Sequence, residues 1–172
     1  MLFDVPRLAI LNETIRALFF HVPMWFGMMI ILLISLIYSI KYLSSNNINH
    51  DIVANEAAKA GVLLGSLGLI TGMIWANFTW GAPWVNDPKL NGAAITMLMY
   101  LAYFILRNSM DETSKKAKVA AVYNIFAYIM LIVFLVVLPR LTDSLHPGNG
   151  GNPAFSTYDL DQKMRLVFYP AI

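Results

Sequence analysis

The 172-residue chain is 58% hydrophobic and only 13% charged, with a formal net charge of +2. Because about a quarter of the residues of a soluble domain are charged, this composition is typical of an integral membrane protein. The absence of cysteine excludes disulfides, thiol redox chemistry and iron–sulfur ligation, and the scattered basic residues predict no nucleic-acid partner.

The first 20 residues are mixed in polarity, and four of their apolar side chains share one helical face. This pattern predicts a short helix lying in the membrane interface, formed around Leu11, Ile15, Leu18 and Phe19. His21 and Pro23 are expected to end this piece. Pro23 suits the first turn of a helix, so the first membrane span is predicted over about 22–43.

Three further apolar segments are long enough to cross a bilayer, at about 55–78, 88–107 and 119–138. Asp87 followed by Pro88 is a good cap and first-turn pair for the third of them. The chain is therefore predicted to be all-α, a polytopic transmembrane helical bundle whose residues 1–172 form a single membrane domain.

The connections between these spans are polar. Residues 44–51 are expected to form a turn, 107–118 a charged aqueous loop, and 139–163 a long loop rich in Pro, Gly, Asn and Ser. Residues 164–172 begin another apolar run that is too short to span a membrane. We interpret them as the start of a truncated fifth span, in a chain that is a piece of a longer protein.

Four glycines lie on one face of the second span at intervals of four, three and four residues: Gly61, Gly65, Gly68 and Gly72. Small residues at this spacing let a second helix backbone approach closely. The pattern does not distinguish packing within one chain from a seam between two copies.

The loop between the second and third spans reads WGAPWVND, from Trp80 to Asp87. Short connections are normally small and polar, so two tryptophans are unusual here. Trp80 and Trp84 fit either an aromatic belt at the membrane interface or a platform for a flat ligand. Asp87 is most simply a helix cap.

The number of crossings fixes which membrane face each loop meets. His21 precedes the first span, the tryptophan loop follows two spans, and His146 follows four. These three features are therefore predicted to share one face, while His50 lies in a loop on the other face and has no expected role. Basic residues divide equally between the faces, so charge alone does not orient the chain.

Two histidines and an aromatic loop on one face are a possible haem site, since iron takes two axial imidazoles and porphyrin needs broad apolar contact. The alternative for each histidine is a polar interfacial residue. Lys89 and Arg140 fit either partners for the haem propionates or interfacial anchors. The sequence contains no G-x-S-x-G, H-E-x-x-H or P-loop, and we expect no enzymatic activity.

The stretch WGAPWVNDPKL resembles the tryptophan-rich signature of the cytochrome c assembly family, the haem-handling proteins CcmC, CcmF and CcsA. That signature is Trp-Gly-x-x-Trp-x-Trp-Asp, and Trp80, Gly81, Trp84 and Asp87 match it. Asn86 stands in place of the third tryptophan, so no stacking is expected there. The segments around His21 (ETIRALFFHVPMW) and His146 (SLHPG) resemble those that carry the histidines of CcmC-type proteins.

This resemblance implies a six-span protein of the bacterial inner membrane that presents haem b on the periplasmic face for cytochrome c maturation. It implies that His21 and His146 are the axial iron ligands and that Trp80 and Trp84 contact the porphyrin. Gly81 would let the loop backbone come close, and Asp87 would order the loop or contact the chaperone. The implied partners are the haem chaperone CcmE, the helper CcmD, and the CcmAB transporter. The alternatives are a CcsA-type synthase subunit, a bis-histidine redox protein, and a structural subunit or small-solute transporter.

Overall fold

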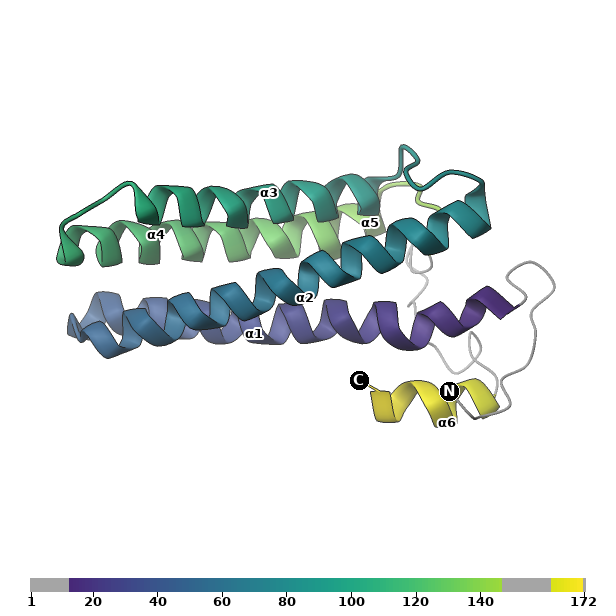
Figure 1. The fold of residues 1–172 in the computed structure, drawn as a ribbon, viewed down its shortest axis with the longest axis horizontal. Coiled ribbons are helices and arrows are strands. Elements are labelled where there is room, and N and C mark those ends of the chain that lie inside the picture. The colour runs from purple at the N-terminus through teal and green to yellow at the C-terminus, as the bar shows by residue number, and fades with distance from the viewer. Residues whose placement is uncertain (1–12, 147–161, 172) are drawn as a thin grey trace.

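The computed structural model describes residues 13–146 and 162–171, which form helices joined by short turns (Figure 1). In chain order these are the 3₁₀ turn η1 (Glu13–Ala17), α1 (Leu18–Ser45), α2 (Ile48–Trp80), α3 (Pro88–Asn108), α4 (Thr113–Ile132), the π turn η2 (Val133–Val137), α5 (Leu138–Leu141), α6 (Gln162–Phe168) and the 3₁₀ turn η3 (Tyr169–Ala171). The predicted all-α fold is confirmed.

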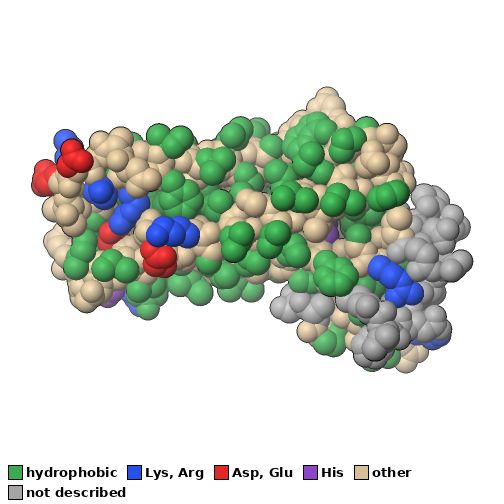
Figure 2. All heavy atoms as spheres, in the orientation of Figure 1, with side chains coloured by type: hydrophobic (Ala, Val, Ile, Leu, Met, Phe, Trp, Pro, Cys, Tyr) green, Lys and Arg blue, Asp and Glu red, His purple; other side chains and the backbone are tan. Residues whose placement is uncertain are grey.

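Four helical segments are long and apolar enough to cross a membrane, which confirms the predicted number of complete spans. They are Thr14–Ser45, Ile48–Trp80, Pro88–Asn108 and Thr113–Leu141. On the face shown in Figure 2, hydrophobic side chains cover the bundle along its length, and the charged side chains gather toward its two ends. This is the surface of an integral membrane protein.

The first two helices begin earlier than predicted. The helical segment that contains α1 starts before His21 and includes Pro23, so the predicted break at these residues is wrong. Packing of α1 along α2 offsets the single backbone hydrogen bond that proline removes. His50 was predicted to lie in a loop but lies in the first turn of α2. The Asn47 side chain accepts the Asn49 N–H and caps this helix, which therefore begins at Ile48, two residues before His50.

The fourth span also continues past Pro139, where the sequence predicted its end. The π turn η2 ends two residues before this proline and relieves the clash expected between its ring and the carbonyl of Leu135. Gly92 of α3 makes room for the turn, since a Cβ there would lie 2.6 Å from the carbonyl oxygen of Phe134.

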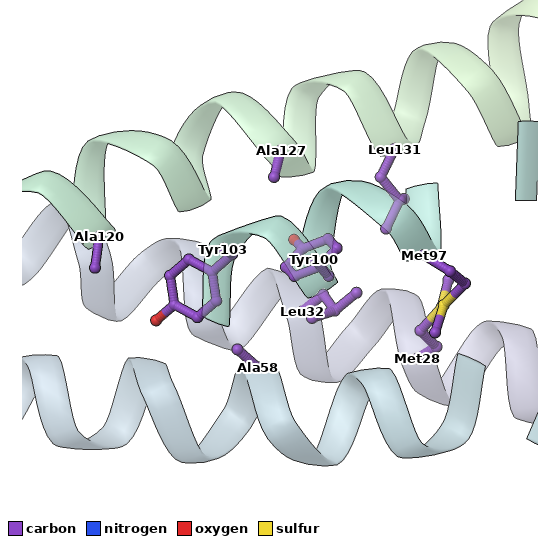
Figure 3. Close-up of a cluster of buried hydrophobic side chains, with 9 residues drawn as sticks. All are labelled: Met28, Leu32, Ala58, Met97, Tyr100, Tyr103, Ala120, Ala127 and Leu131. Atoms are coloured by element: carbon purple, nitrogen blue, oxygen red, sulfur yellow. The ribbon is translucent and has the colours of Figure 1, made fainter. Parts of the chain in front are cut away.

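The glycine face of α2 packs within the chain. A Cβ on Gly61 would lie 2.6 Å from Leu32, and one on Gly65 would lie 2.7 Å from the sulfur of Met28 and 2.6 Å from that of Met97. The two methionines point toward one another in the core, which runs along all four long helices (Figure 3). Close packing of α1 and α2 therefore accounts for these glycines, and a seam between two copies is not needed to explain them.

A polar cluster ties α4 to α1 inside the bundle. The fully buried side-chain amide of Asn124 donates to the hydroxyl oxygens of Ser35, at 2.7 Å, and Ser39, at 2.8 Å. Ser35 in turn donates to the carbonyl of Ala54 on α2 at 2.6 Å. In a membrane such bonds hold helices together, because the hydrophobic effect does not.

One end of the bundle is closed by a buried ion pair between α2 and α3. The Arg107 guanidinium donates to both oxygens of Asp51, and the Nη1–Oδ1 distance is 2.7 Å. We expect Asp51→Asn to lower the free energy of unfolding by about 3–5 kcal/mol, because it leaves a buried cation without its counter-charge. Thermal or denaturant unfolding in detergent would measure this. Lys59→Gln, which breaks the exposed Glu56–Lys59 pair, is the control and should leave stability unchanged; equal effects of the two variants would contradict the prediction.

Candidate functional site

The features singled out by the crossing-number argument meet at one end of the bundle. The start of α1, the tryptophan loop between α2 and α3, and the segment after α5 all lie at this end, whereas the turns after α1 and after α3 lie at the other (Figure 1). His21, Trp80 and His146 therefore lie on one side of the membrane-spanning region, as predicted.

His21 is fixed against α2 by its Nδ1 atom. This nitrogen lies 2.9 Å from the carbonyl oxygen of Gly68 and 3.2 Å from the hydroxyl of Thr71. Because a carbonyl only accepts hydrogen bonds, Nδ1 must carry the proton and donate it. The neutral ring then has its free electron pair on Nε2, which has no hydrogen-bond partner among the described residues.

The glycine face of α2 provides the space for this ring. A Cβ on Gly72 would lie 2.6 Å from Cε1 of His21, so only glycine lets the imidazole lie against the helix there. The ring is flanked edge-on by Trp25, with centroids 6.2 Å apart, and by Trp75, at 5.9 Å. These aromatic side chains hold the imidazole in one orientation.

The tryptophan loop begins where α2 ends. Gly81 terminates the helix in the left-handed conformation, with φ of 79°, and its N–H donates to the carbonyl of Asn77. A Cβ on Gly81 would meet no atom within 4 Å, so this glycine is needed for its backbone angle. The ring of Trp84 is 39% exposed and offers a free aromatic surface.

Asn86, which replaces the third signature tryptophan, supports the loop by a different contact. Its side-chain oxygen accepts a 2.9 Å hydrogen bond from the side-chain amide of Asn91 on α3. The asparagine therefore joins the loop to the first turns of the next helix, and it has no aromatic face to offer a ligand.

Asp87 is the hydrogen-bonding centre of the site, with only 1% of its surface exposed. Its Oδ1 caps α3 by accepting the N–H groups of Lys89 and Leu90. Its Oδ2 accepts the Ser144 hydroxyl at 2.8 Å and the Leu145 N–H at 2.7 Å. One carboxylate thus joins the start of α3 to the segment that follows α5.

The same carboxylate orients His146. Nδ1 of His146 lies 2.9 Å from Oδ1 of Asp87, and its backbone N–H donates to the Ser144 hydroxyl oxygen. The edge of Trp80 packs on the imidazole, with ring centroids 5.1 Å apart. Nε2 again has no hydrogen-bond partner in the part of the chain that the structure describes.

The charges around this pair keep the carboxylate ionised and the imidazole neutral. Burial acts to raise the pKa of Asp87, but hydrogen bonds from the Leu145 N–H and the Ser144 hydroxyl bring it below its ordinary value. Burial lowers the pKa of His146, and the Lys89 ammonium lowers it further, which outweighs the opposing effect of Asp87. An ionised carboxylate only accepts, so Nδ1 of His146 is the protonated nitrogen.

These pKa shifts predict that acid loosens this end of the bundle. The neutral form of His146 is favoured in the fold, so its contribution to stability is complete above its ordinary pKa of 6.5 and is lost as the pH falls through the lower folded value. The contribution of Asp87 is complete above 3.8 and is lost below that pH. The intrinsic tryptophan fluorescence, to which Trp80 contributes, should therefore change only below about pH 6.5 when it is followed from pH 8 to pH 3. A change that is complete between pH 8 and 7 would contradict the assignment.

Lys89 interacts electrostatically with Asp87 and His146, and Arg140 interacts with Lys89. Lys89 is half-buried in the first turn of α3, and Arg140 is exposed in α5. Neither forms an ion pair with any described residue. Both cations are therefore available to an anionic group that approaches this end of the bundle.

The two histidines have the same hydrogen-bonding arrangement. Each ring has Nδ1 fixed to an oxygen acceptor and Nε2 free, and metal-ligating histidines almost always have their second nitrogen bonded in this way. The shared motif, with its surrounding tryptophans, fits a large flat ligand that contains a metal, such as haem.

Comparison with known proteins decides the family. The sequence profile described as "Heme exporter protein C" matches residues 1–157. The chain belongs to the CcmC family. Relatives named Heme exporter protein C include one from Bradyrhizobium diazoefficiens, 34% identical over 70% of this chain and 46% of its own length. Another, from Rhodobacter capsulatus, is 26% identical over 96% of this chain and 65% of its own length.

The match to relatives named Heme exporter protein C extends further along the chain than the match to a relative named CcsA. A protein from Prochlorococcus marinus named Cytochrome c biogenesis protein CcsA is 36% identical over 83 residues, which are 48% of this chain and 26% of that protein. The CcmC resemblance expected from the sequence is confirmed. The chain spans about half to two thirds of the length of the CcmC relatives it matches.

Several residues of the site were missed by sequence reasoning. Trp25 lies one helical turn after His21, and this spacing alone could have placed the two side chains together. Trp75 follows Gly72 by three residues and so lies on the same face of α2 as the four glycines. This spacing could also have placed it beside His21. The role of Ser144 carried no signal, because it depends on how the segment after α5 folds back onto α3.

Proposed function

We propose that this chain binds haem b between His21 and His146 and delivers it, without catalysis, for the maturation of c-type cytochromes. The observation that carries the proposal is the matched state of the two imidazoles. Both lie at one end of the bundle, both have Nδ1 held by an oxygen, and both have Nε2 free to bind iron.

The other site residues have distinct parts in this proposal. Trp80 holds the His146 ring and Trp84 offers its exposed face to the porphyrin. Gly81 turns the chain into the loop. Asp87 is buried and fully hydrogen-bonded, which supports a role in positioning His146 and leaves no free oxygen surface for a partner. Lys89 or Arg140 would receive a propionate.

Membership of the CcmC family supports the remaining parts. We propose that the site faces the periplasm from the bacterial inner membrane, and that haem passes from it to the chaperone CcmE with the help of CcmD and CcmAB. A membrane redox protein with bis-histidine haem is less well supported. Electron transfer across a bilayer needs haem sites near both membrane surfaces, whereas both histidines here belong to segments at one end of the bundle.

Formation of haem-loaded chaperone tests the delivery step. Cells that lack the endogenous CcmC protein would receive this chain, its His21→Ala/His146→Ala variant, or a His50→Ala control. We expect haem-loaded CcmE with the unmodified chain and with the control, and none with the double variant. Normal loading by the double variant would overturn the proposal.

A further inference from the structure

A groove on the outside of the bundle lies between α3 and α4, at the end opposite the histidines. It has a volume of about 470 Å³ and is lined by Leu106, Lys115, Lys118, Val119, Val122, Tyr123 and Phe126. The lining residues of α4 run from 115 to 126, about 16 Å along the helix axis. The groove is thus an open apolar depression along α4, with two lysines at the end nearest the turn between the helices.

The lysines at the start of α4 lie where the helix dipole disfavours cations. Lys115, Lys116 and Lys118 lie in the first two turns of α4, where the positive end of the helix dipole repels cations. The N-cap residue Glu112 makes no side-chain hydrogen bond to the helix. In the described part of the chain, neither Lys115 nor Lys118 pairs with Asp111, Glu112 or any other carboxylate.

An anionic headgroup would satisfy all of these features together. Its phosphate would meet the two ammonium groups and the positive helix terminus, while an acyl chain would lie against Val122, Tyr123 and Phe126. The lysine side chains suit this arrangement, because their apolar stems line the groove while their charges reach the headgroup level. A choline headgroup, which carries its own cation, would not be held in the same way.

We propose that this groove is a binding site for an anionic phospholipid. The site is separate from the histidine end and does not depend on haem binding. It would anchor the α3–α4 turn at the leaflet surface, next to the buried Asp51–Arg107 pair that closes this end of the bundle.

Lipid titration of the detergent-purified chain tests the proposal, with thermal unfolding as the readout. The probes are phosphatidylglycerol, phosphatidylcholine with the same acyl chains, and inorganic phosphate. We expect roughly 10- to 30-fold tighter apparent binding of phosphatidylglycerol than of phosphatidylcholine, since each lysine favours an anionic surface. The preference should be lost in Lys115→Gln/Lys118→Gln and kept in Lys41→Gln/Lys59→Gln, which removes equal charge at the same end.

A second variant tests the groove apart from its charge. Val122 is 58% exposed, so Val122→Trp fills the groove without entering the core, and it should also abolish the preference. Equal binding of the two lipids by the unmodified chain would overturn the proposal. So would retention of the preference in Lys115→Gln/Lys118→Gln, or equal stabilisation by inorganic phosphate, which would mark a site for a soluble anion.

Discussion

Replacing His146 by alanine is expected to weaken haem binding more than a single substitution at any other position except His21. The change removes one of the two Nε2 atoms that we assign to iron, and it also removes the ring on which Trp80 packs. Loss of an outer-shell partner of a metal ligand typically costs roughly 10- to 100-fold in affinity, so loss of the ligand itself should exceed this range. Titration of the purified chain with haem would measure the change.

His50→Ala is the matched control for this experiment. His50 is in α2 at the opposite end of the bundle, where its Nδ1 lies 3.0 Å from the Ser45 hydroxyl and its ring packs on Tyr38. Removing it should leave haem affinity unchanged. If His50→Ala and His146→Ala weakened binding equally, the loss would reflect general damage to the bundle, and the assignment of the site would be wrong.

Replacing Asp87 by asparagine is expected to lower haem affinity by roughly 10- to 100-fold while the helices remain folded. The carboxylate accepts hydrogen bonds from five donors, and the amide has only one oxygen with which to accept them. His146 then loses the charge that orients its Nδ1 proton. Haem titration measures the affinity, and circular dichroism confirms the helical content.

Asn86→Ala distinguishes a role of Asp87 in positioning His146 from a general role in the loop. It breaks the neighbouring hydrogen bond to Asn91 but does not touch His146. We expect Asn86→Ala to bind haem nearly as well as the unmodified chain. An Asp87→Asn variant with unchanged affinity would show that the contact between the carboxylate and His146 has no part in binding.

The hydrophobic runs were sufficient to predict the all-α fold and its four spans, because a bilayer demands long continuous apolar segments. The helix boundaries were less accurate where local signals compete with packing. Pro23 and Pro139 were interpreted as helix ends, yet α1 continues through the first, and a π turn lets the fourth span continue through the second. No local pattern reveals that tertiary contacts offset a lost backbone bond.

The crossing-number argument brought His21, the tryptophan loop and His146 to one end, and the structure agrees. What it could not supply is the orientation of each ring. That orientation depends on the Gly68 carbonyl for His21 and on Oδ1 of Asp87 for His146, contacts that join residues 47 and 59 positions apart. The sequence indicated Asp87 as a cap, which it is; its contact with His146 required the fold. The predictions for residues 1–12 and 147–161, including Pro147 and Gly148, concern segments outside the described residues.

The absorption spectrum of the haem-loaded chain tests the central claim most directly, because it reports how many imidazoles bind the iron. The account predicts a six-coordinate, low-spin b-type spectrum. It also predicts loss of this spectrum in both His21→Ala and His146→Ala, with recovery when free imidazole is added to either variant. A low-spin spectrum that persists unchanged in the double variant would contradict the account.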